Sequence, residues 1–131
     1  MGHQFDELSG QVIEAAISVH RELGPGFLES VYESALKAAL RHRGIIYEPQ
    51  REVTIFFENE EVGTHRLDLI VENQIVVELK AVKALEEFHF AQVRSYLKAT
   101  RLGVGLLLNF NSPKLIIKRI VHTNDSAQIA T

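Results

Sequence analysis

The sequence predicts a single α/β domain with a mixed central β-sheet flanked by helices. The chain has 131 residues, which is enough for one hydrophobic core but not for two domains. Its apolar patterns and turn residues read, in order, helix, helix, three strands, helix and two strands. The strand–helix–strand step in the second half implies a right-handed crossover between parallel strands, and the sheet is therefore expected to be mixed.

Two helices are predicted before the first strand. The first runs from Ser9, a favourable N-cap residue, to Gly24, and its apolar side carries residues at helical spacing: Val12, Ile13, Ala16, Ile17 and Val19. A Gly-Pro-Gly breaker follows at 24–26. The second helix is predicted over about 28–42, with Gly44 as the residue that ends it.

The remaining elements follow from alternating or continuous apolar runs. The predicted strands lie at about 52–57, 65–71, 75–80, 104–109 and 115–121, and a third helix lies at about 86–99. The strands at 65–71 and 75–80 are apolar on both faces, so we expect them to be central and covered on both sides. We expect the folded core to span about residues 9–122 of the single domain 1–131, with 123–131 as a flexible tail.

Composition excludes several classes of protein. The chain is 46% hydrophobic and 24% charged, as ordinary globular proteins are. It has no cysteine, which rules out disulfides and thiolate zinc sites, and its six histidines show no close ligand spacing. The longest apolar run, Val104–Leu108, is too short to cross a membrane, and no basic leader precedes an apolar stretch. We therefore expect a cytoplasmic protein with no membrane partner.

Charge is distributed unevenly along a chain whose net charge is −3. Residues 1–78 hold 14 acidic and 6 basic side chains, whereas residues 79–122 hold 8 basic and 2 acidic ones. The basic half, which includes Lys83 and Arg94, could bind phosphate groups. An ordinary solvated surface explains the same distribution equally well.

The hairpin at 66–80 carries the most informative pattern. Side chains alternate along a strand, so Glu78 and Lys80 share one face. If Glu72–Gln74 is a three-residue turn, Asp68 lies directly opposite Glu78, and Asn73 suits the left-handed conformation that such a turn needs. A turn of two residues would put Asp68 on the other face.

Two carboxylates and an ammonium group in a covered sheet need compensation for lost hydration. In one interpretation, Lys80 or Arg66 pairs with Asp68 or Glu78 in a purely structural ionic cluster. In the other, the carboxylates bind Mg²⁺, which usually takes one or two of its six ligands from carboxylates. Lys80 would then orient a water molecule or stabilise developing negative charge.

Two helical segments carry further polar candidates. Glu29 lies in the first turn of the second predicted helix, with Tyr32 one turn further on. A first-turn Glu is also explained by interaction with the helix dipole. His89, Gln92 and Tyr96 form one stripe of the third predicted helix, and a solvent-facing edge is the alternative explanation.

Taken together, these residues resemble a known family. Four motifs occur in order: Gly26-x-x-Glu29-x-x-Tyr32, Asp68 followed by Glu78-Leu79-Lys80, Gln92-x-x-x-Tyr96, and the strand Leu106–Phe110. The chain resembles the GxxExxY protein family of the PD-(D/E)XK nuclease superfamily from about Ser9 to His122. The resemblance implies a restriction-endonuclease-like core in the order αβββαβ, which agrees with the elements predicted above. Leu67 stands where the superfamily often has proline.

The resemblance also implies roles for individual residues. The expected catalytic residues are Asp68, Glu78, Lys80, Glu29 and Gln92. Of these, Asp68, Glu78 and Glu29 would bind Mg²⁺, or Mn²⁺ in its place, and Lys80 would assist the attacking water. The residues expected to contact the substrate are Tyr32, His89, Tyr96, Lys83 and Arg94.

The leading functional hypothesis is a Mg²⁺-dependent nuclease that hydrolyses phosphodiester bonds of nucleic acid, with DNA as the expected partner. The alternative is a catalytically silent module that keeps the nuclease fold and binds nucleic acid or a protein partner. Hydrolysis of a small phosphate ester is a third hypothesis, although no Gly-rich phosphate loop is present. A homodimer would help a small nuclease to cut both strands.

Overall fold

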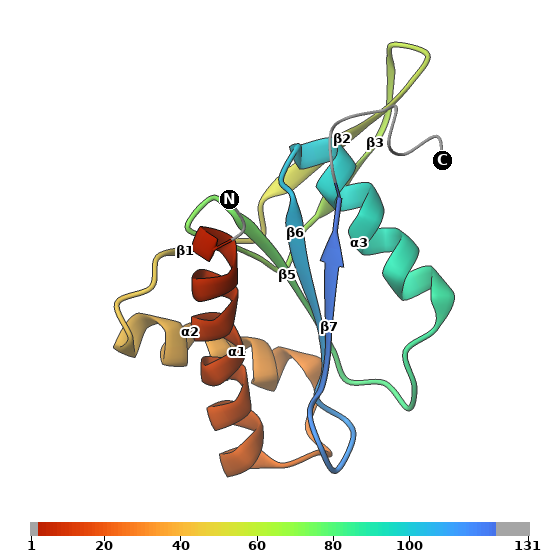
Figure 1. Cartoon of the computed structure of the whole chain (residues 1–131). Coiled ribbons are helices and arrows are strands. Elements are labelled where there is room, and N and C mark those ends of the chain that lie inside the picture. Colours follow the sequence, from red (N-terminus) through yellow and green to blue (C-terminus); the bar gives the residue numbers. More distant parts are fainter. Residues whose placement is uncertain (1–2, 123–131) are drawn as a thin grey trace.

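A five-stranded mixed sheet and a separate two-stranded hairpin organise the molecule, with helices on both faces of the larger sheet (Figure 1). The computed structural model describes the backbone of residues 3–122 and the side chains of residues 7–122. The elements are α1 (His3–Leu23), α2 (Glu29–His42), β1 (Tyr47–Pro49), β2 (Glu52–Phe57), β3 (Glu60–Arg66), β4 (Leu69–Val71), β5 (Ile75–Lys80), α3 (Glu87–Thr100), β6 (Val104–Asn109) and β7 (Ile116–Val121).

The large sheet has the strand order β1-β4-β5-β6-β7. β5 and β6 are parallel and are joined through α3, while the other neighbouring pairs are antiparallel. This confirms the mixed sheet and the crossover predicted from the sequence. The tail predicted at 123–131 lies outside the described residues.

The two faces of the sheet are covered by different helices. α1 and α2 pack on one face over an apolar cluster that includes Leu36, Leu40 and Leu106. α3 packs on the other face over a smaller cluster that includes Val76, Val93 and Leu107. In the described part of the chain, no helix is both long enough and apolar enough to cross a membrane.

The predicted bounds of the first helix are wrong at its start. α1 begins at His3, and Ser9 is buried within it instead of capping it. The C-terminal end is as predicted, because Gly24 adopts a φ of +70° directly after the helix and its N–H donates to the His20 carbonyl. α2 matches its prediction, with Leu28 at the N-cap position and Gly44 at a φ of +71° beyond the C-cap.

The predicted strand at 65–71 is interrupted in the structure. Residues up to Arg66 belong to β3, which pairs with β2 in the separate hairpin, and the chain bends at Leu67 and Asp68 before β4 begins. Leu67 consequently packs in the cluster under α3, whereas Leu69 packs under α1 and α2. A continuous strand would have put both leucines on one face, so that part of the prediction is wrong.

The turn between β4 and β5 is the three-residue turn that the sequence predicted. Val71 pairs with Ile75, and the Gln74 N–H donates to the Val71 carbonyl at 2.9 Å. Asn73 has the expected positive φ of 55°, and Glu72 has one of 53°. Two consecutive residues at positive φ form a tight turn whose twist matches that of the strands.

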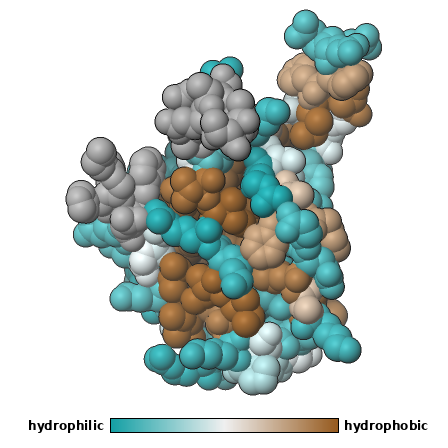
Figure 2. Space-filling view, turned by 45° about the vertical axis from the view of Figure 1, so that its right-hand side comes forward, coloured by the Kyte–Doolittle hydropathy of each residue, from teal (hydrophilic) through white to brown (hydrophobic). Residues whose placement is uncertain are grey.

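The β2–β3 hairpin projects beyond the large sheet, at the upper right of Figures 1 and 2. Its tip residues Glu58 and Asn59 both have positive φ, as a tight hairpin turn requires. Phe56 and Phe57 are exposed near this tip, and β3 is exposed along its whole length. The base of the hairpin lies against α3, through Val53 and Ile55.

Candidate active site

Asp68 and Glu78 are linked by two hydrogen bonds, each from a backbone N–H to a carboxylate oxygen. The register that pairs Leu69 with Val77 carries Asp68 to the position opposite Glu78. The Asp68 N–H donates to Glu78 Oε2 at 2.9 Å, and the Leu79 N–H donates to Asp68 Oδ2 at 2.9 Å. Each carboxylate therefore accepts a hydrogen bond from the opposite segment, which fixes the two side chains beside each other.

Burial makes this pair electrostatically unusual. Glu78 is only 4% exposed, and burial, followed by the charge of Asp68, raises its pKa to about 8. Burial also raises the pKa of Asp68, although the hydrogen bond from the Leu79 backbone opposes that shift. Two carboxylates in this position favour either a proton or a nearby cation.

Glu29 approaches the pair from a distant part of the chain. It is the first residue of α2. Burial and then the charge of Asp68 raise its pKa, whereas Lys80 and the backbone of Ala81 lower it. Glu29 therefore lies within electrostatic range of Asp68 and Lys80, near the end of β5.

Lys80 is the last residue of β5 and is half-buried. Its positive charge lowers the pKa of Glu29, Asp68 and Glu78, so one ammonium group interacts electrostatically with three carboxylates. The Phe110 N–H donates to the Lys80 carbonyl at 2.9 Å and fixes the backbone at this residue.

Asn109 supports the segment after Lys80 and was missed from the sequence. Its side chain is 1% exposed, accepts from the Val82 N–H at 3.1 Å and donates to the Val82 carbonyl at 3.0 Å. A polar residue at the end of the apolar run 104–108 was the available signal, because a buried amide requires partners.

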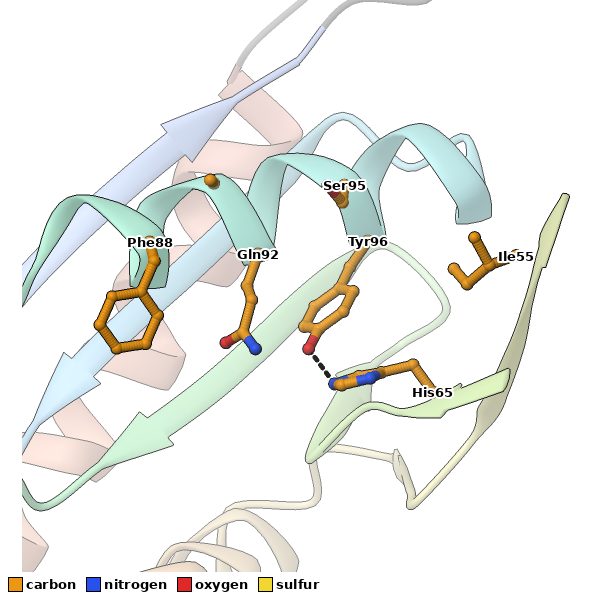
Figure 3. Close-up of a pocket in the computed structure, with 7 residues that line it drawn as sticks. Ile55, His65, Phe88, Gln92, Ser95 and Tyr96 are labelled. Atoms are coloured by element: carbon orange, nitrogen blue, oxygen red, sulfur yellow. Dashed lines mark hydrogen bonds between the residues drawn. The ribbon is translucent and has the colours of Figure 1, made fainter. Parts of the chain in front are cut away.

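Three side chains of α3 point from the helix into a shared space, as Figure 3 shows. Phe88, Gln92 and Tyr96 line a hollow of about 300 Å³ together with Ala91 and Ser95 of α3 and with Ile55 and His65 of the β2–β3 hairpin. The Tyr96 hydroxyl is hydrogen-bonded to His65 Nε2. Burial and then the charges of Glu78 and Asp68 raise the pKa of Tyr96.

One member of the predicted stripe on α3 is different in the structure. Gln92 and Tyr96 face the hollow, but Phe88 and not His89 accompanies them. His89 is buried, and its Nδ1 accepts from the Glu86 N–H at 2.8 Å in a capping box at the start of α3. The solvent-facing alternative is also wrong for His89 and Tyr96, because both are buried.

Tyr32 supports the loop before α2. It is completely buried and stacks on Phe110 with ring centroids 4.7 Å apart. Its hydroxyl donates to the Gly24 carbonyl at 2.5 Å and accepts from the Phe27 N–H at 3.1 Å. In this arrangement Tyr32 has no surface with which to touch a substrate, and it holds the turn that leads to Glu29.

The two basic candidates are exposed. Lys83 lies in the segment between β5 and α3, and Arg94 lies on α3, where it pairs with Glu87 at 2.7 Å. Both side chains are accessible from solvent.

Glu33 and His65 are site neighbours that sequence reasoning missed. The charge of Glu33 raises the pKa of both Glu29 and Asp68, and its Oε2 accepts from Gln50 Nε2 at 2.9 Å. Glu33 follows Glu29 by four residues, a spacing that puts both on one helical face and could have signalled it. His65 is held in β3 by its pairing with Val53, and no local pattern of residues indicates its contact with Tyr96.

The donor chemistry of the carboxylate pair fits Mg²⁺. The available ligands are carboxylate oxygens, and a Mg²⁺ site needs only one or two of them because water and phosphate oxygens fill the other positions. Across the described residues, however, no group of three or more His, Cys, Asp or Glu side chains is arranged to hold a metal ion. The structure thus brings Asp68 and Glu78 together as a pair, with Glu29 as an electrostatic neighbour.

Comparisons with known proteins give a family and a similar fold. A family model described as the PD-(D/E)XK nuclease superfamily matches residues 6–120. The crystal structure of SSO0001 is similar, with a TM-score of 0.59 and 20% sequence identity over 76% of this chain and 52% of that one. The chain thus spans about half the length of that protein, and this likeness concerns the fold alone. No curated protein matches the chain.

Proposed function

The chain belongs to the PD-(D/E)XK nuclease superfamily, and from this premise we propose that it is a Mg²⁺-dependent nuclease. Its proposed reaction is hydrolysis of phosphodiester bonds in nucleic acid, with DNA as the expected substrate and Mn²⁺ as a substitute metal. Membership of the GxxExxY family within the superfamily stays a prediction.

One observation carries the proposal. Asp68 and Glu78 lie opposite each other, and each accepts a backbone hydrogen bond from the other's segment. Burial raises the pKa of Asp68, Glu78 and Glu29, and Lys80 opposes all three shifts. The charge of Asp68 adds to the rise at Glu78 and Glu29, and that of Glu33 adds to the rise at Asp68. A purely structural ionic cluster would be expected to balance its charges more closely, because unpaired buried charges are costly. An excess of carboxylates beside one lysine is better explained by a site that binds a divalent cation.

The three carboxylates have different proposed roles. Asp68 and Glu78 would hold the cation, with Glu29 as the additional carboxylate. Bound Mg²⁺ supplies a water of lowered pKa and neutralises phosphate charge. In the hydrolysis, a water oxygen attacks the phosphorus atom and the phosphorus–oxygen bond to the leaving sugar breaks.

The chain's own residues position this reaction. Lys80 directs its N–H groups toward the water and the developing negative charge, where hydrogen-bond donors are most effective. Gln92 and Tyr96 support the substrate from α3, and Lys83 and Arg94 contact flanking phosphates. Tyr32 and His89 act indirectly, since they hold the start of α2 and the start of α3.

The test is a cleavage assay with Mg²⁺, with Mn²⁺ and with a chelator, across single-stranded, double-stranded and branched substrates. Lys80→Ala should reduce cleavage by at least about 100-fold, because it removes donors from the transition state. Asp68→Ala should reduce cleavage at least as strongly. Lys98→Ala is the matched control, since Lys98 is an exposed lysine in the last turn of α3.

Equal cleavage by Lys80→Ala and the unmodified protein would show that the assignment is wrong. If no substrate is cut and calorimetry detects neither Mg²⁺ nor Mn²⁺ binding, the catalytically silent module becomes the better explanation. Light scattering in the same buffer tests the homodimer, which stays a prediction.

A further inference from the structure

The hollow between α3 and the β2–β3 hairpin has a lining that differs from that of the carboxylate site. Its walls are formed by Phe88, Ala91, Gln92, Ser95 and Tyr96 from the helix, and by Ile55 and His65 from the hairpin. None of these lining residues is Asp, Glu, Lys or Arg. A phosphate group or another strong anion would have no Lys or Arg side chain to pair with in this hollow, whereas a neutral group does not need such a partner.

The side chains of the lining fit an aromatic group with a polar edge. Phe88 is 60% exposed, and Figure 3 shows its ring extended from α3 beside Gln92. Base stacking on such rings does not depend strongly on sequence, because every base has a π-face. The Gln92 amide offers both a donor and an acceptor, and the Ser95 hydroxyl offers the same pair of functions for the polar edge of a base.

The position of the hollow relates it to the proposed reaction. The Tyr96 hydroxyl forms one wall and is bonded to His65, which precedes Asp68 by only three residues. Tyr96 also lies within electrostatic range of Glu78 and Asp68. Through Tyr96 and His65, the hollow is therefore linked to the short segment of chain that leads to Asp68.

We propose that this hollow binds one unpaired nucleobase next to the phosphate that is cut. The inference rests on the proposed function and goes beyond it, because it names a substrate class. A base inside a paired duplex cannot enter the hollow without leaving its stack. The substrate would therefore present an unpaired nucleotide beside the cleavage position, as single strands, flaps and flipped-out nucleotides do.

A binding experiment tests the inference separately from catalysis. The protein is used in a Lys80→Ala background with Mg²⁺, so that bound substrate is not consumed, and the probe is a fluorescein-labelled single-stranded DNA oligonucleotide measured by anisotropy. Phe88→Ala should weaken binding by about 5- to 100-fold, the effect of losing one stacked base. Phe88→Trp should bind the oligonucleotide with the same affinity as the protein that carries Phe88, because tryptophan also offers a ring for stacking.

Phe57→Ala is the matched control. Phe57 is 64% exposed, similar to Phe88, but it lies near the hairpin tip and does not line the hollow. Its substitution should leave affinity within about 2-fold, because scattered surface substitutions have small effects.

Abasic positions in the oligonucleotide locate the bound base. At one position, removal of the base should weaken binding to the protein that retains Phe88 but should have little further effect on Phe88→Ala, since both changes remove the same contact. Additive losses at every position would overturn the inference. Equal affinities with and without the Phe88→Ala substitution would also overturn it, as would the absence of any binding.

The outcomes for the two proposals can be told apart. Cleavage that depends on Lys80 but not on Phe88 would support the nuclease and overturn the base site. Binding that depends on Phe88 in a protein that never cuts would overturn the nuclease, and with it the place of the base beside a cut phosphate, but would support base binding in the hollow.

Discussion

The two faces of the five-stranded sheet differ in the chemistry of the side chains that cover them. The face under α1 and α2 is packed with aliphatic side chains and with the Tyr32–Phe110 stack. The face under α3 carries a smaller apolar cluster. Beside this cluster lie the buried carboxylate of Glu78, the Tyr96–His65 pair and the hollow. Among the described residues, Glu78 is the buried carboxylate of the chain.

This difference indicates how the fold accommodates a costly site. Apolar burial contributes roughly 25 cal/mol for each Å² removed from water, so the larger apolar cluster under α1 and α2 should contribute more stability than the cluster under α3. Buried carboxylates reduce stability unless something compensates their lost hydration. We infer that the α1–α2 face mainly stabilises the sheet and contributes Glu29 from the first turn of α2, while the Asp68–Glu78 pair lies on the side of α3.

The largest expected effect concerns the α1–α2 face. Leu40 is completely buried near the end of α2, far along the helix from Glu29. Leu40→Ala should lower the free energy of unfolding by about 2–5 kcal/mol, because it leaves a cavity. Urea unfolding measures this loss. Cleavage per folded molecule, assayed well below the melting temperature, should stay unchanged; a large fall would contradict the division between the faces.

The next effect concerns the close contact between α3 and the sheet. A Cβ added at Gly105 of β6 would lie 2.7 Å from Val93 Cγ1. Gly105→Ala should therefore cost about 1–3 kcal/mol of stability through overpacking, which urea unfolding measures. It should also reduce cleavage, because the helix that carries Gln92 and Tyr96 must move.

A second substitution checks that mechanism. Val93→Ala removes the methyl group that a Cβ at position 105 would contact. The double variant Gly105→Ala, Val93→Ala should therefore recover part of the loss in unfolding free energy. Simple addition of the two losses would show that the helix contact is not the cause.

The third prediction concerns the pH dependence of stability. The pKa of Glu78 rises from 4.5 to about 8 on folding. Between these pH values the folded state binds more protons than the unfolded state. The free energy of unfolding should therefore fall as pH increases through this interval, by up to about 1.4 kcal/mol per pH unit.

Glu78→Gln should flatten this slope and should be more stable than the unmodified protein at pH 8, since its amide carries no charge. Urea unfolding at several pH values measures both. Mg²⁺ should stabilise the unmodified protein at pH 8 and should have less effect on the variant, because binding to the folded state alone raises stability. Identical pH slopes in the two proteins would contradict the role assigned to Glu78.

The smallest expected effect concerns the contact between the hairpin and α3. Tyr96→Phe removes the hydroxyl that bonds to His65. The loss should be about 0.5–1.5 kcal/mol in urea unfolding, the usual contribution of one hydrogen bond. His65→Ala should lose a similar amount, and the double variant should lose little more. Independent effects of the two substitutions would rule out a shared interaction.

The sequence predicted the elements whose signals are local. Alternation placed Glu78 and Lys80 on one face, the parity of the turn placed Asp68 opposite Glu78, and Gly44 marked the end of α2. These features depend on neighbouring residues and on strand geometry, so one chain contains enough information to derive them.

Other features depend on tertiary contacts and were missed. β3 is exposed at every residue, so it has no hydrophobic alternation, and β1 is a three-residue edge strand. The bend at Leu67 and Asp68 interrupts a predicted strand, because residues up to Arg66 pair with β2 whereas residues from Leu69 pair with β1 and β5. On α3, helical spacing allowed either His89 or Phe88 to accompany Gln92, and packing selected Phe88.

The exchange of hydrogen bonds between Asp68 and Glu78 has a consequence for the order of folding. These residues are ten positions apart in one hairpin, and hairpins form within about 1–10 μs. Glu29 belongs to a helix far upstream, and its approach requires long-range closure, which is slow. We expect the carboxylate pair to form early and to gain its third member late.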